Sequence, residues 1–208
     1  MGGDFAPAHV VEGTVDAVRE APGRFSVILV GQTDSIEAEL RRLTDQGKKI
    51  PGDRITMVNA AEVITMEDSP TAALRSKKNS SIAVGLGMHR EGKAQAFVSA
   101  GNTGAVMSAS TLILGRIEGV GRPTIGALVP TAQSPCFLVD AGANVDCKPR
   151  HFFEFAVMGS IYMSSIAGVS NPRVGLLNVG EEDAKGNEIV VESFSLLKNS
   201  RLNFVGNV

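Results

Sequence analysis

The feature that most constrains the fold of this chain is a glycine-rich turn at residues 99–104, which reads Ser-Ala-Gly-Asn-Thr-Gly. A short apolar run precedes it at residues 96–98, and apolar residues follow it at helical spacing. This order predicts a buried strand over 96–98, a tight turn, and a helix that Asn102 or Thr103 caps. A strand that passes through a glycine turn into a helix is typical of α/β proteins.

The same turn is suited to binding an anion. Gly101 and Gly104 have no Cβ, so a ligand can approach the backbone closely. A helix N-terminus carries unsatisfied N–H groups and about half a positive charge, which favours phosphate or carboxylate. Ser99, Asn102 and Thr103 add polar side chains to this predicted phosphate site. The alternative interpretation is a helix entrance that binds nothing.

Charge and composition limit the classes of function that this chain can have. The chain has 208 residues, with 20 Lys and Arg against 22 Asp and Glu, so it has no general basic field to attract nucleic acid. One Tyr and no Trp leave few platforms for stacking on bases. A hydrophobic share of 43% is ordinary for a globular protein. We therefore expect one α/β region over residues 1–208 that binds no nucleic acid.

The cysteines and the hydropathy indicate a cytoplasmic protein without a metal or another cofactor. Cys136 and Cys147 lack C-x-x-C spacing and histidine co-ligands, so they predict buried free thiols. No apolar run approaches the ~20 residues of a membrane span. Peripheral contact with a membrane remains compatible with this pattern.

The order of elements predicts a mostly parallel sheet. An apolar run at 25–30, an amphipathic helix from Thr33 and a second run at 55–58 indicate a parallel crossover. Strands at 125–129 and 136–139 have a short connection, which favours antiparallel pairing. The chain opens on a glycine turn with no strand before it and stops within a βα unit, so we expect a fold truncated at both ends.

A long helix is predicted to start at Pro149. Apolar residues cover more than one stripe of it, which favours a surface left for a partner subunit.

Three further loops carry polar residues of interest. Arg75, Lys77 and Lys78 precede a predicted helix with hydroxyl residues between them, and they either hold phosphate or form a solvated face. Asp140 and Asn144 follow a predicted strand, where ligands bind in open α/β sheets. The third loop spans residues 178–187 and again follows a strand.

Four loops together resemble one family, the bacterial phosphate acyltransferases of phospholipid synthesis. They read Met-Gly-Gly-Asp-Phe-Ala-Pro at 1–7, Ser-Ala-Gly-Asn-Thr-Gly-Ala at 99–105, Asp-Ala-Gly-Ala-Asn at 140–144, and Gly-Leu-Leu-Asn-Val-Gly-Glu-Glu at 175–182 with Lys185 and Gly186. The resemblance implies transfer of a fatty acyl group from acyl carrier protein to inorganic phosphate. The acyl phosphate formed would serve a glycerol-3-phosphate acyltransferase.

The resemblance also implies an architecture and a setting. The expected fold is a three-layer α/β/α arrangement like that of isocitrate and isopropylmalate dehydrogenases. The expected assembly is a homodimer, loosely attached to the inner face of the membrane. Members of the family begin with a strand before Met-Gly-Gly-Asp and continue beyond the last residues of this chain.

The chemistry of the residues agrees with an attack by phosphate itself. No G-x-S-x-G motif occurs, and no histidine has an evident serine or cysteine partner. Phosphate that attacks a thioester directly needs only a cradle, alignment and donors for the developing oxyanion.

We therefore predict roles for the residues of the four motifs. The residues assigned to phosphate or acyl binding are Gly3, Asp4, Lys78, Ser99, Gly101, Asn102, Thr103, Gly104 and Asn144. Lys185, Asp140 and Asn178 are the candidate catalytic residues, and Arg75 and Lys77 are assigned to docking of acyl carrier protein. Either Lys78 or Lys185 supplies the cation, either Asn144 or Asn178 donates to the thioester oxygen, and Asp140 alternatively caps the following turn.

Three other functions remain open. A metal-dependent dehydrogenase of the same fold would use Asp4, Asp140 and Asp183 for magnesium. A phosphotransacetylase would act on a coenzyme A thioester. A non-catalytic module would only dock acyl carrier protein through its cations.

Overall fold

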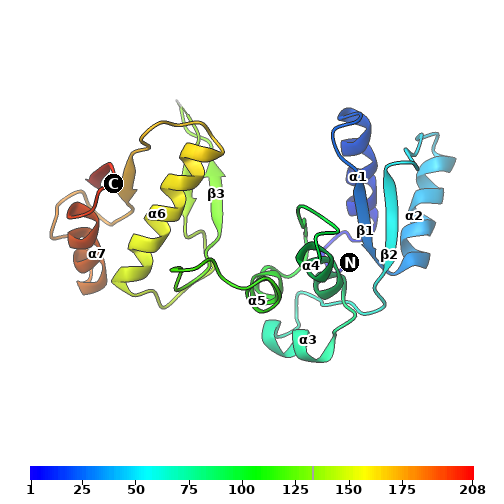
Figure 1. The fold of residues 1–208 in the computed structure, drawn as a ribbon, viewed down its shortest axis with the longest axis horizontal. Helices are drawn as coiled ribbons and strands as arrows, with labels where there is room; N and C mark the ends of the chain where they lie inside the picture. Colours follow the sequence, from blue (N-terminus) through cyan, green and yellow to red (C-terminus); the bar gives the residue numbers. More distant parts are fainter. Residues whose placement is uncertain (133) are drawn as a thin grey trace. The chain divides into compact units, whose positions relative to one another are not determined.

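The computed structural model describes residues 1–132 and 134–208. The chain divides into two compact units, Met1–Gly115 and Arg116–Val208. The α/β class is confirmed, because each unit contains both helices and strands (Figure 1). The described strands form three sheets of two strands each. The three-layer architecture and the single region over 1–208 stay predictions.

The first unit begins with a helix, which a β-α-β arrangement follows along the chain. It consists of α1 (Ala8–Glu20), β1 (Val27–Gly31), α2 (Thr33–Asp45) and β2 (Ile55–Asn59). β1 and β2 pair in parallel, as the crossover pattern predicts. The two helices pack on each other and on the strands (Figure 1). Their shared core is formed by Val11, Val15, Val18, Leu29, Ile36, Leu43 and Ile55.

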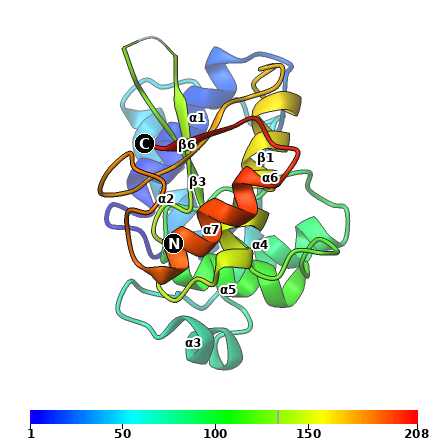
Figure 2. The same cartoon turned by 90° about the vertical axis from the view of Figure 1, so that its left-hand side faces the viewer.

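Three helices complete the first unit: α3 (Pro70–Ser76), α4 (Ser81–Arg90) and α5 (Thr103–Ile113). α5 packs on both α3 and α4 (Figure 2). It begins where the glycine turn predicts a helix. The apolar face of this group is buried in a second core of Ile64, Ala73, Ile82, Leu86, Ala105 and Ala109.

The predicted strand over residues 96–98 is wrong. These residues form no strand, and Val98 is 92% exposed. No strand among the described residues lies alongside them to complete a hydrogen-bonded ladder. Phe97 instead packs on the second core, with its ring over Gly85 of α4. A Cβ on Gly85 would collide with that ring, which explains a glycine in the middle of a helix.

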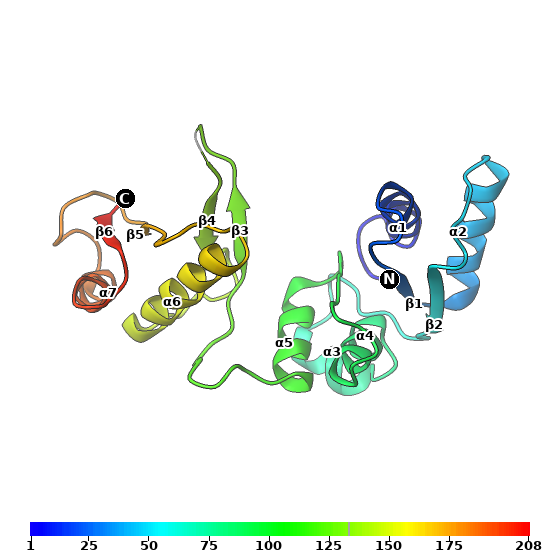
Figure 3. The same cartoon turned by 45° about the horizontal axis from the view of Figure 1, so that its top comes forward.

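The second unit contains a hairpin, a long helix and a small parallel pair. The hairpin strands are β3 (Gly126–Val129) and β4 (Cys136–Val139), which pair antiparallel as predicted. α6 (Pro149–Ser165) contacts β4 (Figure 3).

β5 (Val174–Leu176) and β6 (Phe204–Asn207) form the parallel pair of the second unit, and α7 (Glu188–Lys198) connects them. α7 also packs on α6. Leu176, Phe194 and Leu197 are buried where these elements meet.

Two surface features of the second unit bear on the predictions from sequence. Ile161 and Ile166 of the α6 region are 59% and 71% exposed, so the helix does present apolar side chains outside the core. A partner subunit on this surface stays a prediction. The prediction of buried thiols is wrong for Cys136, which is exposed at the edge of the hairpin, and Cys147 is half-buried.

Candidate active site

Asn102 organises the glycine turn of the first unit. Its side chain is 7% exposed, and its Oδ1 accepts a hydrogen bond from the Ala105 amide at 3.0 Å. Its Nδ2 donates to the carbonyls of Thr65 at 3.1 Å and Asp68 at 3.3 Å. Asn102 therefore caps α5 and fixes the start of that helix against the segment that precedes α3.

The cap leaves a short run of backbone donors open. The Gly101 amide donates to Ser99 Oγ at 3.2 Å, and the Ala105 amide is taken by Asn102. Within residues 1–132 and 134–208, the amides of Asn102, Thr103 and Gly104 have no hydrogen-bond acceptor. Three consecutive N–H groups at the N-terminus of an 11-residue helix form a suitable site for a small anion.

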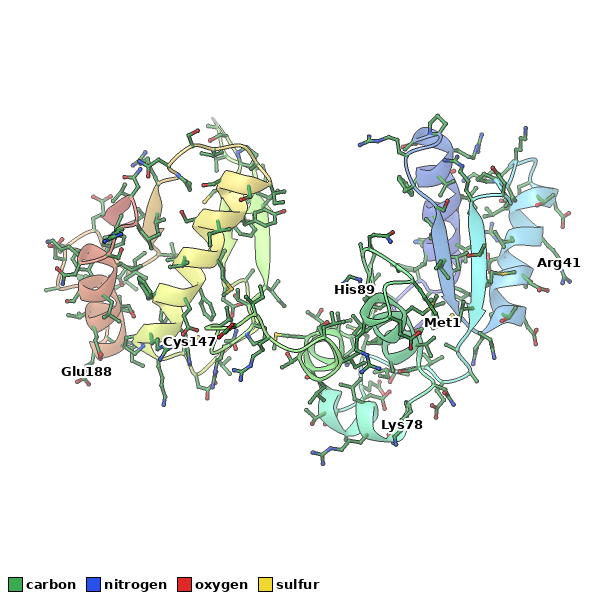
Figure 4. All side chains as sticks on the ribbon, viewed as in Figure 1. Met1, Arg41, Lys78, His89, Cys147 and Glu188 are labelled. Carbon is green, nitrogen blue, oxygen red and sulfur yellow. The ribbon has the colours of Figure 1, made fainter. Side chains whose placement is uncertain are left out.

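The N-terminal motif lies against this turn. A Cβ on Gly3 would stand 2.7 Å from the Ala100 carbonyl oxygen, so only glycine allows this approach of the two loops. Met1 lies beside the carboxyl end of β1 and contacts the Gly31 region (Figure 4). Asp4 is exposed. Two of the four motifs identified from sequence are thus brought together in the first unit.

The three cations near α3 have different surroundings. Lys77 Nζ lies 2.6 Å from Asp68 Oδ2 and donates to the Val63 carbonyl at 2.8 Å. The hydrogen bond from this ammonium is the main reason why the pKa of Asp68 is lowered, and the hydrogen bond from the Thr65 amide adds to the effect. Arg75 and Lys78 are exposed and have no partner in the described part of the chain. Lys77 is therefore a structural cation, whereas Arg75 and Lys78 are available to a ligand.

Asp140 of the second unit is surrounded by hydrogen-bond donors. Oδ1 accepts from Thr124 Oγ1 at 2.8 Å and from the Ile125 amide at 3.0 Å. Oδ2 accepts from the Asn144 amide at 2.7 Å and from Asn144 Nδ2 at 3.2 Å. Burial acts to raise the pKa of Asp140, but the donors of Ile125, Thr124 and Asn144 outweigh it and hold the pKa below its usual value.

This geometry indicates what Asp140 and Asn144 do locally. The Asn144 amide group also donates to the Pro123 carbonyl at 3.0 Å, so both ends of the loop are tied to the segment just before β3. A carboxylate with a lowered pKa is a weak base. The arrangement favours the alternative in which Asp140 holds the turn that follows it.

The loop over residues 178–187 is held by two side-chain amides, one from the loop itself and one from the end of β6. Asn178 Nδ2 donates to the Lys185 carbonyl at 2.8 Å, and Asn207 Nδ2 donates to the Glu182 carbonyl at 2.7 Å. Lys185 is half-exposed, and its Nζ lies 3.9 Å from Glu182 Oε1. Because that ion pair is long and open to solvent, the Lys185 charge is free to meet a ligand.

The structure adds residues that the sequence analysis missed. Asp68 accepts from Lys77 and Asn102 through different oxygens, and Thr124 supports Asp140. Asn207 is buried, and its Oδ1 has no hydrogen-bond partner in the described residues. Their positions could have indicated these roles from sequence: Asp68 lies just before α3, Thr124 just before β3 and Asn207 at the end of β6. Polar residues at such junctions often hydrogen-bond to the backbone of a neighbouring loop.

The described residues contain neither a membrane-spanning helix nor a cluster of metal ligands. None of the helices in residues 1–132 and 134–208 combines the length and apolar character needed to cross a membrane. Nor does any group of three or more His, Cys, Asp or Glu in these residues gather as metal ligands would.

The comparison with known proteins places the whole chain in one family. A model of the family described as "Fatty acid synthesis protein" matches residues 1–208. The chain belongs to the fatty acid synthesis protein family. Proteins called phosphate acyltransferase resemble this family member along its entire length.

Three relatives illustrate the likeness. The chain is 46% identical to the phosphate acyltransferase of Clostridium botulinum strain Loch Maree, 48% to that of Acetivibrio thermocellus and 47% to that of Heliobacterium modesticaldum. Each match covers 100% of this fatty acid synthesis family chain. The chain spans 60% of the length of each of these relatives.

Proposed function

We propose that this protein transfers a long-chain fatty acyl group from acyl carrier protein to inorganic phosphate. The observation that carries the proposal is the run of three amides at Asn102, Thr103 and Gly104, which have no acceptor among the residues that the structure describes. The family and the names of its relatives support the reaction class. Acyl carrier protein as the donor follows from the resemblance of the four motifs.

The proposed reaction needs no covalent intermediate on the protein. A phosphate oxygen attacks the thioester carbonyl carbon, a new C–O bond forms, and the C–S bond breaks. The hydrogen phosphate proton passes to the departing thiolate, so the products are an acyl phosphate and the free thiol of the carrier. The protein contributes by holding phosphate and stabilising charge, which are large terms in such reactions.

The cradle for phosphate lies in the first unit. The amides of Asn102, Thr103 and Gly104 donate to the phosphate oxygens, and the Thr103 hydroxyl adds a fourth donor. Asn102 acts as a positioning residue, because its side chain is already engaged with Ala105, Thr65 and Asp68. Lys78 is exposed and has no ion-pair partner among the described residues, and we assign it to neutralise phosphate. Charge-assisted hydrogen bonds of this kind are about twice as strong as neutral ones.

In the second unit we keep the predicted role of Lys185, and we assign Asp140, Asn144 and Asn178 to positioning in place of the catalytic and binding roles predicted from sequence. Lys185 offers an accessible charge, and Asn178 supports the Lys185 backbone. Asp140 and Asn144 hold their own loop through mutual hydrogen bonds. We therefore favour Lys185 as the residue of this unit that acts on a substrate, with Asp140, Asn144 and Asn178 in positioning roles.

The proposal includes a cellular setting. The protein acts in the cytoplasm with loose attachment to the inner face of the membrane, as a homodimer with a three-layer α/β/α fold. Its acyl phosphate passes to a glycerol-3-phosphate acyltransferase. Arg75 docks the acidic acyl carrier protein, since it is exposed and unpaired among the described residues, whereas Lys77 is engaged with Asp68.

An acyl-phosphate assay tests the function. Inorganic phosphate and acyl carrier protein loaded with a long acyl chain are mixed with the 208-residue chain without any nucleotide. We expect acyl phosphate to accumulate in proportion to enzyme. Faster reaction with acyl coenzyme A would favour a phosphotransacetylase, and binding of acyl carrier protein without product would favour a docking module. Either outcome would overturn the proposal.

A further inference from the structure

The second unit contains an apolar hollow of about 270 Å³ between the β3–β4 hairpin and α6. Figure 3 shows α6 alongside these two strands. The rings of Phe137 and Tyr162 stack at the hollow with 4.4 Å between their centroids and 13° between their planes. Val139 and Met158 complete its apolar wall.

Two glycines keep this space open. Gly159 of α6 faces Val139, and a Cβ there would stand 3.4 Å from Val139 Cγ2. Gly126 of β3 faces the Phe137 ring so closely that no Cβ fits. Any larger residue at position 159 would therefore extend into the hollow from the helix side.

The hollow adjoins the loop that contains Asp140. Val139 lines the hollow and is followed directly by Asp140. Thr124 lines it as well, while its Oγ1 donates to Asp140 Oδ1 at 2.8 Å. The apolar space thus begins where one of the four family motifs starts.

We propose that this hollow holds part of the fatty acyl chain of the substrate and sets the chain-length preference. The inference rests on the proposed function, which requires a seat for an apolar tail. No charged side chain is among the residues that line the hollow, so it is poorly suited to a nucleotide or a phosphate. Stacked rings with aliphatic and thioether side chains suit a methylene chain. Tyr162 is 38% exposed, so the hollow is open to solvent.

The chain provides a direct reporter of occupancy. Tyr162 is its only tyrosine, and it has no tryptophan. Tyrosine emission of the 208-residue chain therefore reports on the hollow alone. We expect titration with dodecanoate to change this emission saturably, whereas acetate at the same concentrations has no effect. An emission that does not respond to dodecanoate would overturn the inference.

Substitution at position 159 tests which residues form the seat. Gly159→Leu should weaken dodecanoate binding at least tenfold, since each displaced methylene costs about fourfold in affinity. Gly159→Ala should have a smaller effect in the same direction. Gly13→Leu is the matched control, because Gly13 is an exposed helical glycine and no described atom lies within 4 Å of its Cβ position. Wild-type affinity in a folded Gly159→Leu chain would overturn the inference.

The acyl-phosphate assay separates this inference from the proposed function. With donors of increasing chain length, Gly159→Leu should shift the preferred length downward while turnover of short donors persists. An unchanged length profile would contradict the acyl seat even though the reaction occurs. If the wild-type chain makes no acyl phosphate, the proposed function fails, and the Tyr162 titration still decides whether the hollow binds an acyl tail.

Discussion

Lys77 Nζ lies 2.6 Å from Asp68 Oδ2, whereas Lys78, the next residue, has no partner in the described part of the chain. The two lysines form a matched pair for substitution. Lys77→Met should lower the melting temperature, because it removes the donor to Asp68 and to the Val63 carbonyl. Lys78→Met should leave the melting temperature unchanged and raise the phosphate concentration needed for half-maximal turnover. Scanning calorimetry and steady-state kinetics check the two effects.

The opposite pattern would contradict these assignments. A stable Lys77→Met chain with impaired phosphate use would make Lys77 the ligand-binding cation. A destabilised Lys78→Met chain would show that its charge serves the fold.

Asn102→Ala should destabilise the first unit by about 2 kcal/mol. The substitution removes the acceptor for the Ala105 amide and leaves three carbonyl oxygens without their donor. Asn102→Ser keeps a good helix cap but loses the Nδ2 donor, so it should recover part of the loss. Urea denaturation of the three chains measures both contributions. Equal stability of Asn102→Ala and wild type would mean that the cap does not form in solution.

Asp140→Asn should destabilise the second unit by about 2 kcal/mol, since one carboxylate oxygen becomes an NH₂ group that faces two donors. The pKa of Asp140 is lowered in the folded chain despite its burial, because Ile125, Thr124 and Asn144 donate to it. Its ionised form therefore stabilises the fold above about pH 4, and this stabilisation is lost as the pH falls through the folded pKa.

The pH dependence supplies a second readout for Asp140. Between pH 7 and pH 2, the free energy of unfolding should fall less steeply in Asp140→Asn than in wild type. Parallel curves for the two chains would show that Asp140 does not titrate with a lowered pKa.

Lys185→Met should reduce turnover without lowering stability. Its Nζ lies 3.9 Å from Glu182 in a solvent-exposed pair, so little folding energy depends on it. Lys198→Met is the control, because Lys198 pairs with Asp183 at 2.8 Å and lies over the Phe194 ring at 5.3 Å. Turnover measured at saturating phosphate compares Lys185→Met with the control Lys198→Met. Wild-type turnover in Lys185→Met would assign that lysine to the surface.

Local patterns predict the helices that begin at Thr33, Thr103 and Pro149. The start of α5 at Thr103 follows from a cap residue and a helical repeat within a few positions of each other. The strand expected over 96–98 depends on a neighbour elsewhere in the chain, and none lies there in the described residues. An apolar run indicates which residues are buried, but it does not indicate which element buries them. Phe97 is packed against Gly85 of α4 and is not part of a sheet.

Side-chain roles are harder to predict, because they depend on partners distant in sequence. Asp140 meets Thr124 and Ile125, which lie 16 and 15 positions away along the chain. No spacing rule identifies those partners, and so Asp140 could be read as a base or as a cap. The sequence likewise does not distinguish the neighbouring lysines Lys77 and Lys78. Lys77 has a structural role because Asp68 lies beside it in the fold.

The central claim is that backbone amides of the turn hold phosphate for its attack on the acyl carbon. A phosphate titration that follows the ¹H–¹⁵N resonances of Asn102, Thr103 and Gly104 tests it most directly, with the amide of Gly13 as an internal reference. We predict saturable shifts at the three amides, none at Gly13, and none anywhere with equal ionic strength of chloride. Unmoved resonances at phosphate concentrations that support turnover would contradict the account.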